Sequence, residues 1–175
     1  FTLRAEVRPD PWLAFISDHT LHFQPISIQG YFNSEIPEKT YLTWDLKNLQ
    51  WDSLKLDQWK VSIQPRGDSL RLDSEIQGLQ QGSLRLNQAN IAMAASQDLV
   101  KLGIQVRDSV GQPIHRVGLQ LEQVETSYFL SLDPNGWQIY YEDFQSMAGG
   151  RAILTSKGIE FDSLGLRKGR QELLV

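Results

Sequence analysis

Apolar and polar residues alternate with a period of two along most of the chain. Trp59, Val61 and Ile63, for example, alternate with Lys60 and Ser62. Alternation over about four to eight residues indicates strands with one apolar face and one hydrated face. Antiparallel sheets give this pattern, whereas parallel sheets buried on both faces do not. The sequence therefore predicts an all-β, antiparallel fold, from alternating runs that include residues 42–46, 54–63, 70–72, 84–86, 102–106, 117–121, 128–132 and 159–166.

Turn-forming residues separate these runs. The segments 65–68 (Pro-Arg-Gly-Asp), 108–111 (Asp-Ser-Val-Gly) and 133–136 (Asp-Pro-Asn-Gly) are typical of hairpin connections. One short helix is predicted over residues 11–18, because Asp10 followed by Pro11 resembles a helix N-cap with proline at the first helical position.

Two architectures fit this pattern equally well. A curved or U-shaped antiparallel sheet would leave its apolar face open as the lining of a groove. A closed β-sandwich would bury that face against a second sheet. Both chain ends, Phe1-Thr2-Leu3 and Leu173-Leu174-Val175, have the character of strands. We therefore expect residues 1–175 to be a single β-rich fragment excised from a larger, repetitive β protein.

Composition and motifs argue against several function classes. The net charge of −4 is spread along the chain, so no basic stripe predicts a nucleic-acid partner. His19 and His22 lack acidic or cysteine partners at metal-ligand spacing, and no nucleotide-binding or nucleophile motif is present. The tripeptide at residues 66–68 is better explained as a turn than as an adhesion motif. We predict no enzyme activity, no metal and no cofactor.

Several segments resemble the AsmA-like and TamB-like proteins of the bacterial envelope. Residues 10–30 look like their helix, strand and glycine unit, and residues 76–86 are similar to their recurring ladder of strands and glycines. Residues 130–139 and 158–171 most closely resemble the TamB-like proteins of the Bacteroidetes, with a tryptophan strand, a turn and a strand that ends in glycine, a polar residue and glutamine.

The resemblance implies a cellular role. Such proteins are anchored in the inner membrane, cross the periplasm and fold into an open apolar trough called a β-taco. They are thought to carry phospholipid to the outer membrane or to assist outer-membrane assembly. The expected partners are phospholipid acyl chains and an outer-membrane assembly protein, and the expected location is the periplasm. The alternative is a β-sandwich module of a secreted or surface protein that recognises glycan or protein.

An apolar trough needs aliphatic side chains on one face of successive strands. The second half of the chain combines regular alternation with few aromatic residues that would fill a groove. The predicted groove lining is Leu84, Leu86, Ile91, Met93, Leu102, Ile104, Val106, Val117, Leu119, Leu121, Leu130 and Leu132.

Overall fold

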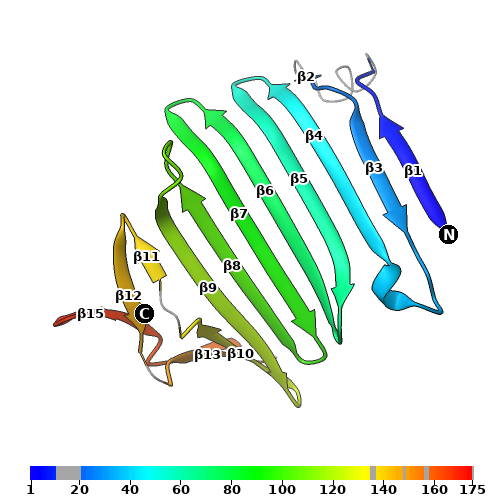
Figure 1. Ribbon diagram of the computed structural model, residues 1–175. Coiled ribbons are helices and arrows are strands. Elements are labelled where there is room, and N and C mark those ends of the chain that lie inside the picture. The colour runs from blue at the N-terminus through cyan, green and yellow to red at the C-terminus, as the bar shows by residue number, and fades with distance from the viewer. Residues whose placement is uncertain (11–20, 135–136, 148, 156–157, 175) are drawn as a thin grey trace.

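The computed structural model describes residues 1–10, 21–134, 137–147, 149–155 and 158–174, and Figure 1 shows a broad sheet of long strands. A 3-10 turn, η1 (Pro37–Lys39), is the one helical element that these residues form. The predicted helix at residues 11–18 lies outside them. The strands are β1 (Thr2–Val7), β2 (Leu21–His22), β3 (Ile26–Tyr31), β4 (Tyr41–Trp51), β5 (Leu54–Arg66), β6 (Ser69–Gln81), β7 (Leu84–Ser96), β8 (Leu99–Arg107), β9 (Pro113–Val124), β10 (Ser127–Leu132), β11 (Trp137–Ile139), β12 (Glu142–Ser146), β13 (Arg151–Thr155), β14 (Gly158–Asp162), β15 (Gly165–Lys168) and β16 (Gln171–Leu174).

The strands pair with their neighbours along the chain. The order β1-β3-β4-β5-β6-β7-β8-β9 forms the main sheet, in which every pair is antiparallel. At its far edge, β9 pairs with both β10 and β11, and these begin two branches: β10-β13-β14 and β11-β12-β15-β16. Among the described strands, β1 pairs only with β3, so the sheet remains open. The predicted all-β, antiparallel, open sheet is confirmed.

Tight hairpins fix the register of the main sheet. The pairs that close the β4–β5, β5–β6, β6–β7, β7–β8 and β9–β10 hairpins leave two loop residues each. Each of these loops begins with a residue at positive φ, for example Gly67 at 63° and Gly82 at 58°. Such loops match the right-handed twist of the flanking strands. The glycines at these two positions adopt this backbone conformation without the steric cost of a Cβ atom.

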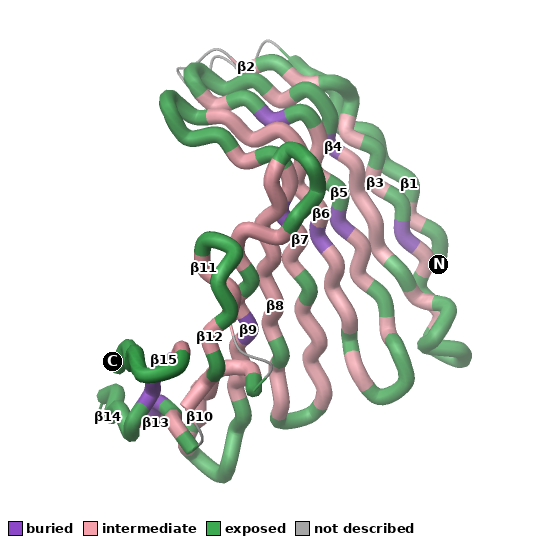
Figure 2. Tube along the Cα trace, turned by 60° about the vertical axis from the view of Figure 1, so that its left-hand side comes forward, coloured by how far each residue is buried: buried purple, intermediate pink, exposed green. Residues whose placement is uncertain are grey.

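No second layer covers the main sheet in the part of the chain that the structure describes. Apart from the contact of η1 with β5, all the principal contacts between described elements join strands that are neighbours in the sheet. The protein exposes 12147 Å² of surface, whereas a compact protein of 20.0 kDa is expected to expose about 8,700 Å². The excess means that much of the sheet is open on both sides, as Figure 2 illustrates by its few buried positions.

The strands of the main sheet bend over near one end, as Figure 2 shows. We place the bend at the level of Asn48, Asp57, Gly78 and Asn87, where the ladders of β4–β5, β5–β6 and β6–β7 are interrupted. Asn48 and Gly78 have positive φ values of 51° and 64° at this level. A residue in that conformation turns a strand sharply.

The bend also changes which residues face inwards. Apolar residues flank it three positions apart, at Leu46 and Leu49, Leu56 and Trp59, Ile76 and Leu79, and Leu86 and Ala89. Strict alternation would place each such pair on opposite faces. However, Leu46, Leu56 and Ala89 are all buried, while Asn48, Asp57 and Asn87 are exposed. The apolar residues therefore lie inside the bend on both of its sides, and the polar residues between them lie outside.

Candidate functional site

The apolar face of the main sheet is the first candidate site. Pairing across the strands aligns its side chains into rows that run perpendicular to them. One row consists of Ala5, Ile28, Trp44, Val61, Ser74, Ile91, Ile104 and Val117. A second row consists of Leu3, Gly30, Leu42, Ile63, Leu72, Met93, Leu102, Leu119 and Leu132. These rows form a continuous apolar surface.

The register brings ten of the twelve predicted lining residues onto this face of β7–β10. Ile91, Ile104 and Val117 are direct neighbours in the first row, and Met93, Leu102, Leu119 and Leu132 are neighbours in the second. Val106 pairs with Ala89, and Leu121 pairs with Leu130. All ten are half-buried, as expected for side chains covered by their neighbours but not by a second layer.

The other two predicted residues, Leu84 and Leu86, lie beyond the bend. Leu86 pairs with Leu79, and Leu84 pairs with Gln81 and is 58% exposed. Leu86 continues the inner apolar surface past Leu79, towards Leu49 and Leu56 on the neighbouring strands. The lining is therefore longer than a strict period of two indicates, because it continues around the bend.

The first half of the chain contributes residues that the predicted lining omitted. Trp44 and Trp59 pack edge to face on β4 and β5, with ring centroids 5.9 Å apart. The Trp59 indole Nε1 donates a hydrogen bond to the Ser74 hydroxyl at 2.9 Å, which satisfies a buried polar group on the apolar face. This end of the face is aromatic, whereas the end formed by β7–β9 is aliphatic up to His115. The sequence did contain a signal for these residues. The two-residue hairpin loops fix the register of β4–β6 and align their apolar residues with those of β7.

An aromatic contact marks the β9 end of the apolar face. His115 pairs with Val106 and therefore follows the aliphatic residues of β8 and β9 on that face. Its ring packs edge to face against Tyr140, with centroids 4.7 Å apart, and its Nδ1 accepts a hydrogen bond from the Tyr140 backbone N–H at 3.4 Å. The turn between β11 and β12 therefore covers part of this corner.

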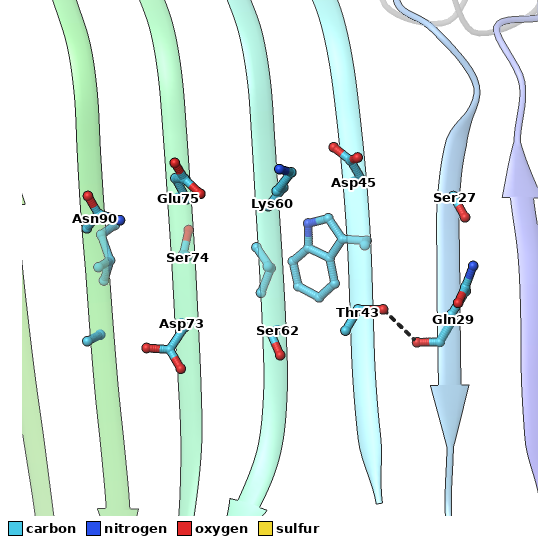
Figure 3. Close-up of a pocket in the computed structure, with 14 residues that line it drawn as sticks. Ser27, Gln29, Thr43, Asp45, Lys60, Ser62, Asp73, Ser74, Glu75 and Asn90 are labelled. Atoms are coloured by element: carbon cyan, nitrogen blue, oxygen red, sulfur yellow. Dashed lines mark hydrogen bonds between the residues drawn. The ribbon is translucent and has the colours of Figure 1, made fainter.

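A second candidate site is a groove of about 540 Å³ on the opposite, polar face. Figure 3 shows the side chains from β3 to β7 that line it. One wall is the row Ser27, Asp45, Lys60, Glu75 and Asn90, and the other is the row Gln29, Thr43, Ser62, Asp73 and Ala92. The residues between these two rows belong to the apolar face, so it is their backbone that forms the floor.

Neighbouring side chains already engage the carboxylates of this groove. Asp45 accepts a hydrogen bond from the Gln58 amide at 2.7 Å. Arg71 donates two hydrogen bonds to Asp73, at 2.6 and 2.8 Å. Glu75 accepts hydrogen bonds from the amides of two glutamines on β6 and β7. The polar face is therefore a ladder of partly exposed, mutually paired groups, a common way to hydrate the outer side of a sheet.

Among the described residues, no group of three or more histidine, cysteine, aspartate or glutamate side chains is arranged to hold a metal ion. No helix formed by these residues has the length and apolar character to cross a bilayer. Of the two neighbouring histidines considered as metal ligands, His19 lies outside the described residues and His22 lies in β2 opposite Gln50.

Comparison with protein families, with curated proteins and with solved structures gave no match to this chain. The site is therefore interpreted from its own geometry.

Proposed function

We propose that this chain is one section of an open apolar trough that carries phospholipid acyl chains across the periplasm. Its parent would be anchored in the inner membrane, and the lipid would move towards the outer membrane or support protein assembly there, as in the TamB-like proteins that the sequence resembles. The observation that carries the proposal is a concave apolar face that extends across the main sheet, with no described strand packed over it and only its corner at His115 covered by Tyr140.

The dimensions of this face suit an acyl chain. A row that crosses the strands from β1 to β9 extends about 34 Å at about 4.8 Å per strand. The hydrocarbon core of a bilayer, which spans two acyl layers, is about 30 Å thick. A single acyl chain lying along a row would therefore fit within the sheet. A succession of such sheets would give a lipid a continuous apolar path.

The energetics also suit transport rather than permanent storage. Full burial of a methylene group contributes about 0.8 kcal/mol. An open trough covers about half of the surface of an acyl chain. Twelve methylene groups would therefore gain about half of their full burial energy, on the order of 5 kcal/mol. Affinity of that order holds a lipid and still allows it to move along the face, because no polar contact fixes its position.

Photo-crosslinking tests the proposal at residues of one strand that face opposite ways. A crosslinking side chain at Leu102 or Val106 would lie on the apolar face, and one at Gln105 would lie on the polar face. Each variant is mixed with vesicles of phosphatidylethanolamine and phosphatidylglycerol. We expect lipid adducts at Leu102 and Val106 and few at Gln105. Equal labelling at the three positions, or none on the apolar face, would contradict the proposal.

Charge substitution supplies a second test with a matched control. Ile104→Asp places an unpaired carboxylate between Ile91 and Val117 on the apolar face, where it would be poorly solvated beside a lipid. Gln105→Asp introduces the same charge on the polar face, at the next residue of the same strand and between Asn90 and Arg116. We expect Ile104→Asp to abolish most adducts and Gln105→Asp to leave them unchanged, with both variants keeping a β-type circular dichroism spectrum.

A glycan- or protein-binding module remains the second candidate, and the polar groove is the observation that favours it. Amide, carboxylate and hydroxyl groups of the kind that line this groove hydrogen-bond sugars well. We rank it second because the groove carboxylates are already engaged by Gln58, Arg71 and other neighbours. Titration of the protein with soluble oligosaccharides, followed by NMR at Asn90 and Gln29, would detect such binding.

A further inference from the structure

The outer edge of β1 is an unpaired strand edge within the part of the chain that the structure describes, and Figure 1 shows it at the border of the sheet. The strand has six residues, and every one except Leu3 is exposed. Exposed edges of this kind template pairing with another strand, and natural proteins usually protect them with charges, prolines or bulges. The sequence of β1 offers charges of both signs, at Arg4 and Glu6.

Hydrogen bonding to β3 determines which groups of β1 remain available. Phe1 and Phe32 exchange two backbone hydrogen bonds, at 2.8 and 2.9 Å. Since such pairs alternate along an antiparallel ladder, Leu3, Ala5 and Val7 also direct their backbone groups towards β3. The N–H and C=O groups of Thr2, Arg4 and Glu6 then point outwards from the sheet.

A second copy of β1 can satisfy these outward groups in one particular register. If two antiparallel β1 strands meet with Ala5 opposite Ala5 of the second copy, Arg4 stands opposite Glu6 in both directions. Both residues of each such pair direct their backbone groups outwards, so each pair forms two backbone hydrogen bonds. Leu3 then faces Val7 on the apolar side.

Neighbouring registers lack this complementarity. If one β1 strand slides by two residues along the other, Arg4 stands opposite Arg4 or Glu6 stands opposite Glu6. Like charges directly opposite each other are destabilising. Two other described strands of four or five residues also have an unpaired edge: β14 presents Glu160 and Asp162, and β16 presents Glu172. Each would face a copy of itself with acidic residues and no basic partner. Complementarity to itself is therefore a specific property of β1.

We propose that two copies of this chain associate through β1 in an isologous, antiparallel dimer with Ala5 on the twofold axis. The axis is perpendicular to the sheet, so the apolar faces of the two copies lie on the same side and become continuous. The Glu6 carboxylate, which already accepts a hydrogen bond from Arg8 at 2.6 Å, also receives Arg4 of the second copy. The proposal concerns residues 1–175 by themselves, and it is independent of whether the apolar face binds lipid.

Cysteine crosslinking tests the register, since the chain contains no cysteine. Residues of a non-hydrogen-bonded pair have Cα atoms about 4.5 Å apart, within the range that a disulfide bridges. Ala5→Cys should therefore form a disulfide-linked dimer under mild oxidation. Arg4→Cys and Glu6→Cys should crosslink at least about tenfold more slowly, because their copies are diagonal to each other. Faster crosslinking at residue 4 or 6, or equal rates at all three, would overturn the proposal.

Charge reversal tests the specificity in the chain without cysteine. Arg4→Glu or Glu6→Arg alone places two like-charged pairs in the dimer, and the dissociation constant should rise about tenfold or more. The double variant with both substitutions restores opposite charges and should return close to the original affinity. Arg4→Pro removes an outward N–H and the Arg4 charge, but no N–H that bonds to β3, so it should abolish dimers while β1 stays paired with β3. Sedimentation equilibrium measures each case. A monomer at all concentrations, or reversals without effect, would refute the dimer.

Discussion

The main sheet and the two branches that follow it bury their apolar side chains in different ways. Strands β4–β9 are 9 to 13 residues long and lie in one layer, and their buried apolar residues, Leu46, Leu56, Val61 and Ala89, are covered by neighbours on the same face. Strands β10–β16 are 3 to 6 residues long, yet they bury Ala152 to 1% and Leu166 to 3%.

The difference follows from chain geometry. A long hairpin extends a single layer, and each side chain is covered only by neighbours on its own face. A short strand must turn back at once, which brings a third segment over the first two. At Gly150, for instance, an added Cβ would lie 2.4 Å from the Ser163 carbonyl oxygen, so the chain closes tightly there. A small closed core therefore stands beside a large open face in the same protein.

The largest effect that we predict concerns this small core. Leu166→Ala removes a side chain that is 3% exposed and should lower the free energy of unfolding by about 2–4 kcal/mol. Its matched control is Leu173, which pairs with Leu166 on β16 but is 57% exposed. Leu173→Ala should cost less than about 1 kcal/mol. Urea denaturation measures both, and equal losses would mean that the branch has no closed core.

The next effect concerns the bend of the main sheet. In Gly78→Ala the new Cβ would lie 1.8 Å from an Asp57 carboxylate oxygen and 2.8 Å from the Asp57 Cβ, at a residue with a φ of 64°. We expect a loss of about 2–3 kcal/mol. Gly67→Ala is the control, since Gly67 has a φ of 63° but nothing within 4 Å of the added atom. It should lose about 1 kcal/mol. Similar losses would show that the bend tolerates side chains.

The fold of the main sheet was largely predictable from its sequence. Alternation of side chains reports directly on which residues share a face, and Gly67 and Gly82 mark hairpin loops that fix the register. The bend also leaves a trace. Leu56 and Trp59, and likewise Leu86 and Ala89, interrupt the period of two, and such a change of phase at the same level of neighbouring strands indicates a corner.

The branches and the candidate site were less predictable. Strands as short as β11 give too few residues for a period to emerge, and the pairing of β9 with both β10 and β11 depends on contacts between distant segments. The choice between an open and a closed apolar face depends on whether a second layer exists. No local pattern around Ile104 encodes that, because the alternation is the same in both cases.

A smaller effect is predicted for the hydrogen bond between Trp59 and Ser74 on the apolar face of the main sheet. Trp59→Phe removes the donor to the Ser74 hydroxyl, and Ser74→Ala removes the acceptor. A double-mutant cycle of these substitutions should give a coupling free energy of about 0.5–1.5 kcal/mol, since Ser74 is buried. Thermal or urea unfolding of the four proteins supplies the cycle. Additive losses would mean that the bond contributes nothing to the stability of the sheet.

The smallest effect concerns one of the side-chain contacts that join the two regions. Asp108, in the loop between β8 and β9, accepts a hydrogen bond from the Tyr141 hydroxyl at 2.9 Å, and Tyr141 lies in the turn between β11 and β12. Burial alone would raise the pKa of Asp108. Bonds from the backbone N–H groups of Gln112 and Val110 and from Tyr141 outweigh it, so this pKa is lowered. The bond to Asp108 raises the pKa of Tyr141 above its ordinary value.

These two shifts predict opposite pH dependences for the contact. A lowered carboxyl pKa gives stability that is complete above about pH 4 and is lost as the pH falls through the folded-state pKa. A raised tyrosine pKa gives stability that is present below about pH 10 and is lost as the pH rises through the folded-state value. Free energies of unfolding measured at pH 2–5 and pH 9–11 by urea titration should therefore decline at both ends. Asp108→Asn should flatten the acidic decline and Tyr141→Phe the basic one. If both variants keep the profile of the original protein, the hydrogen bond between Asp108 and Tyr141 contributes nothing to the pH dependence of stability.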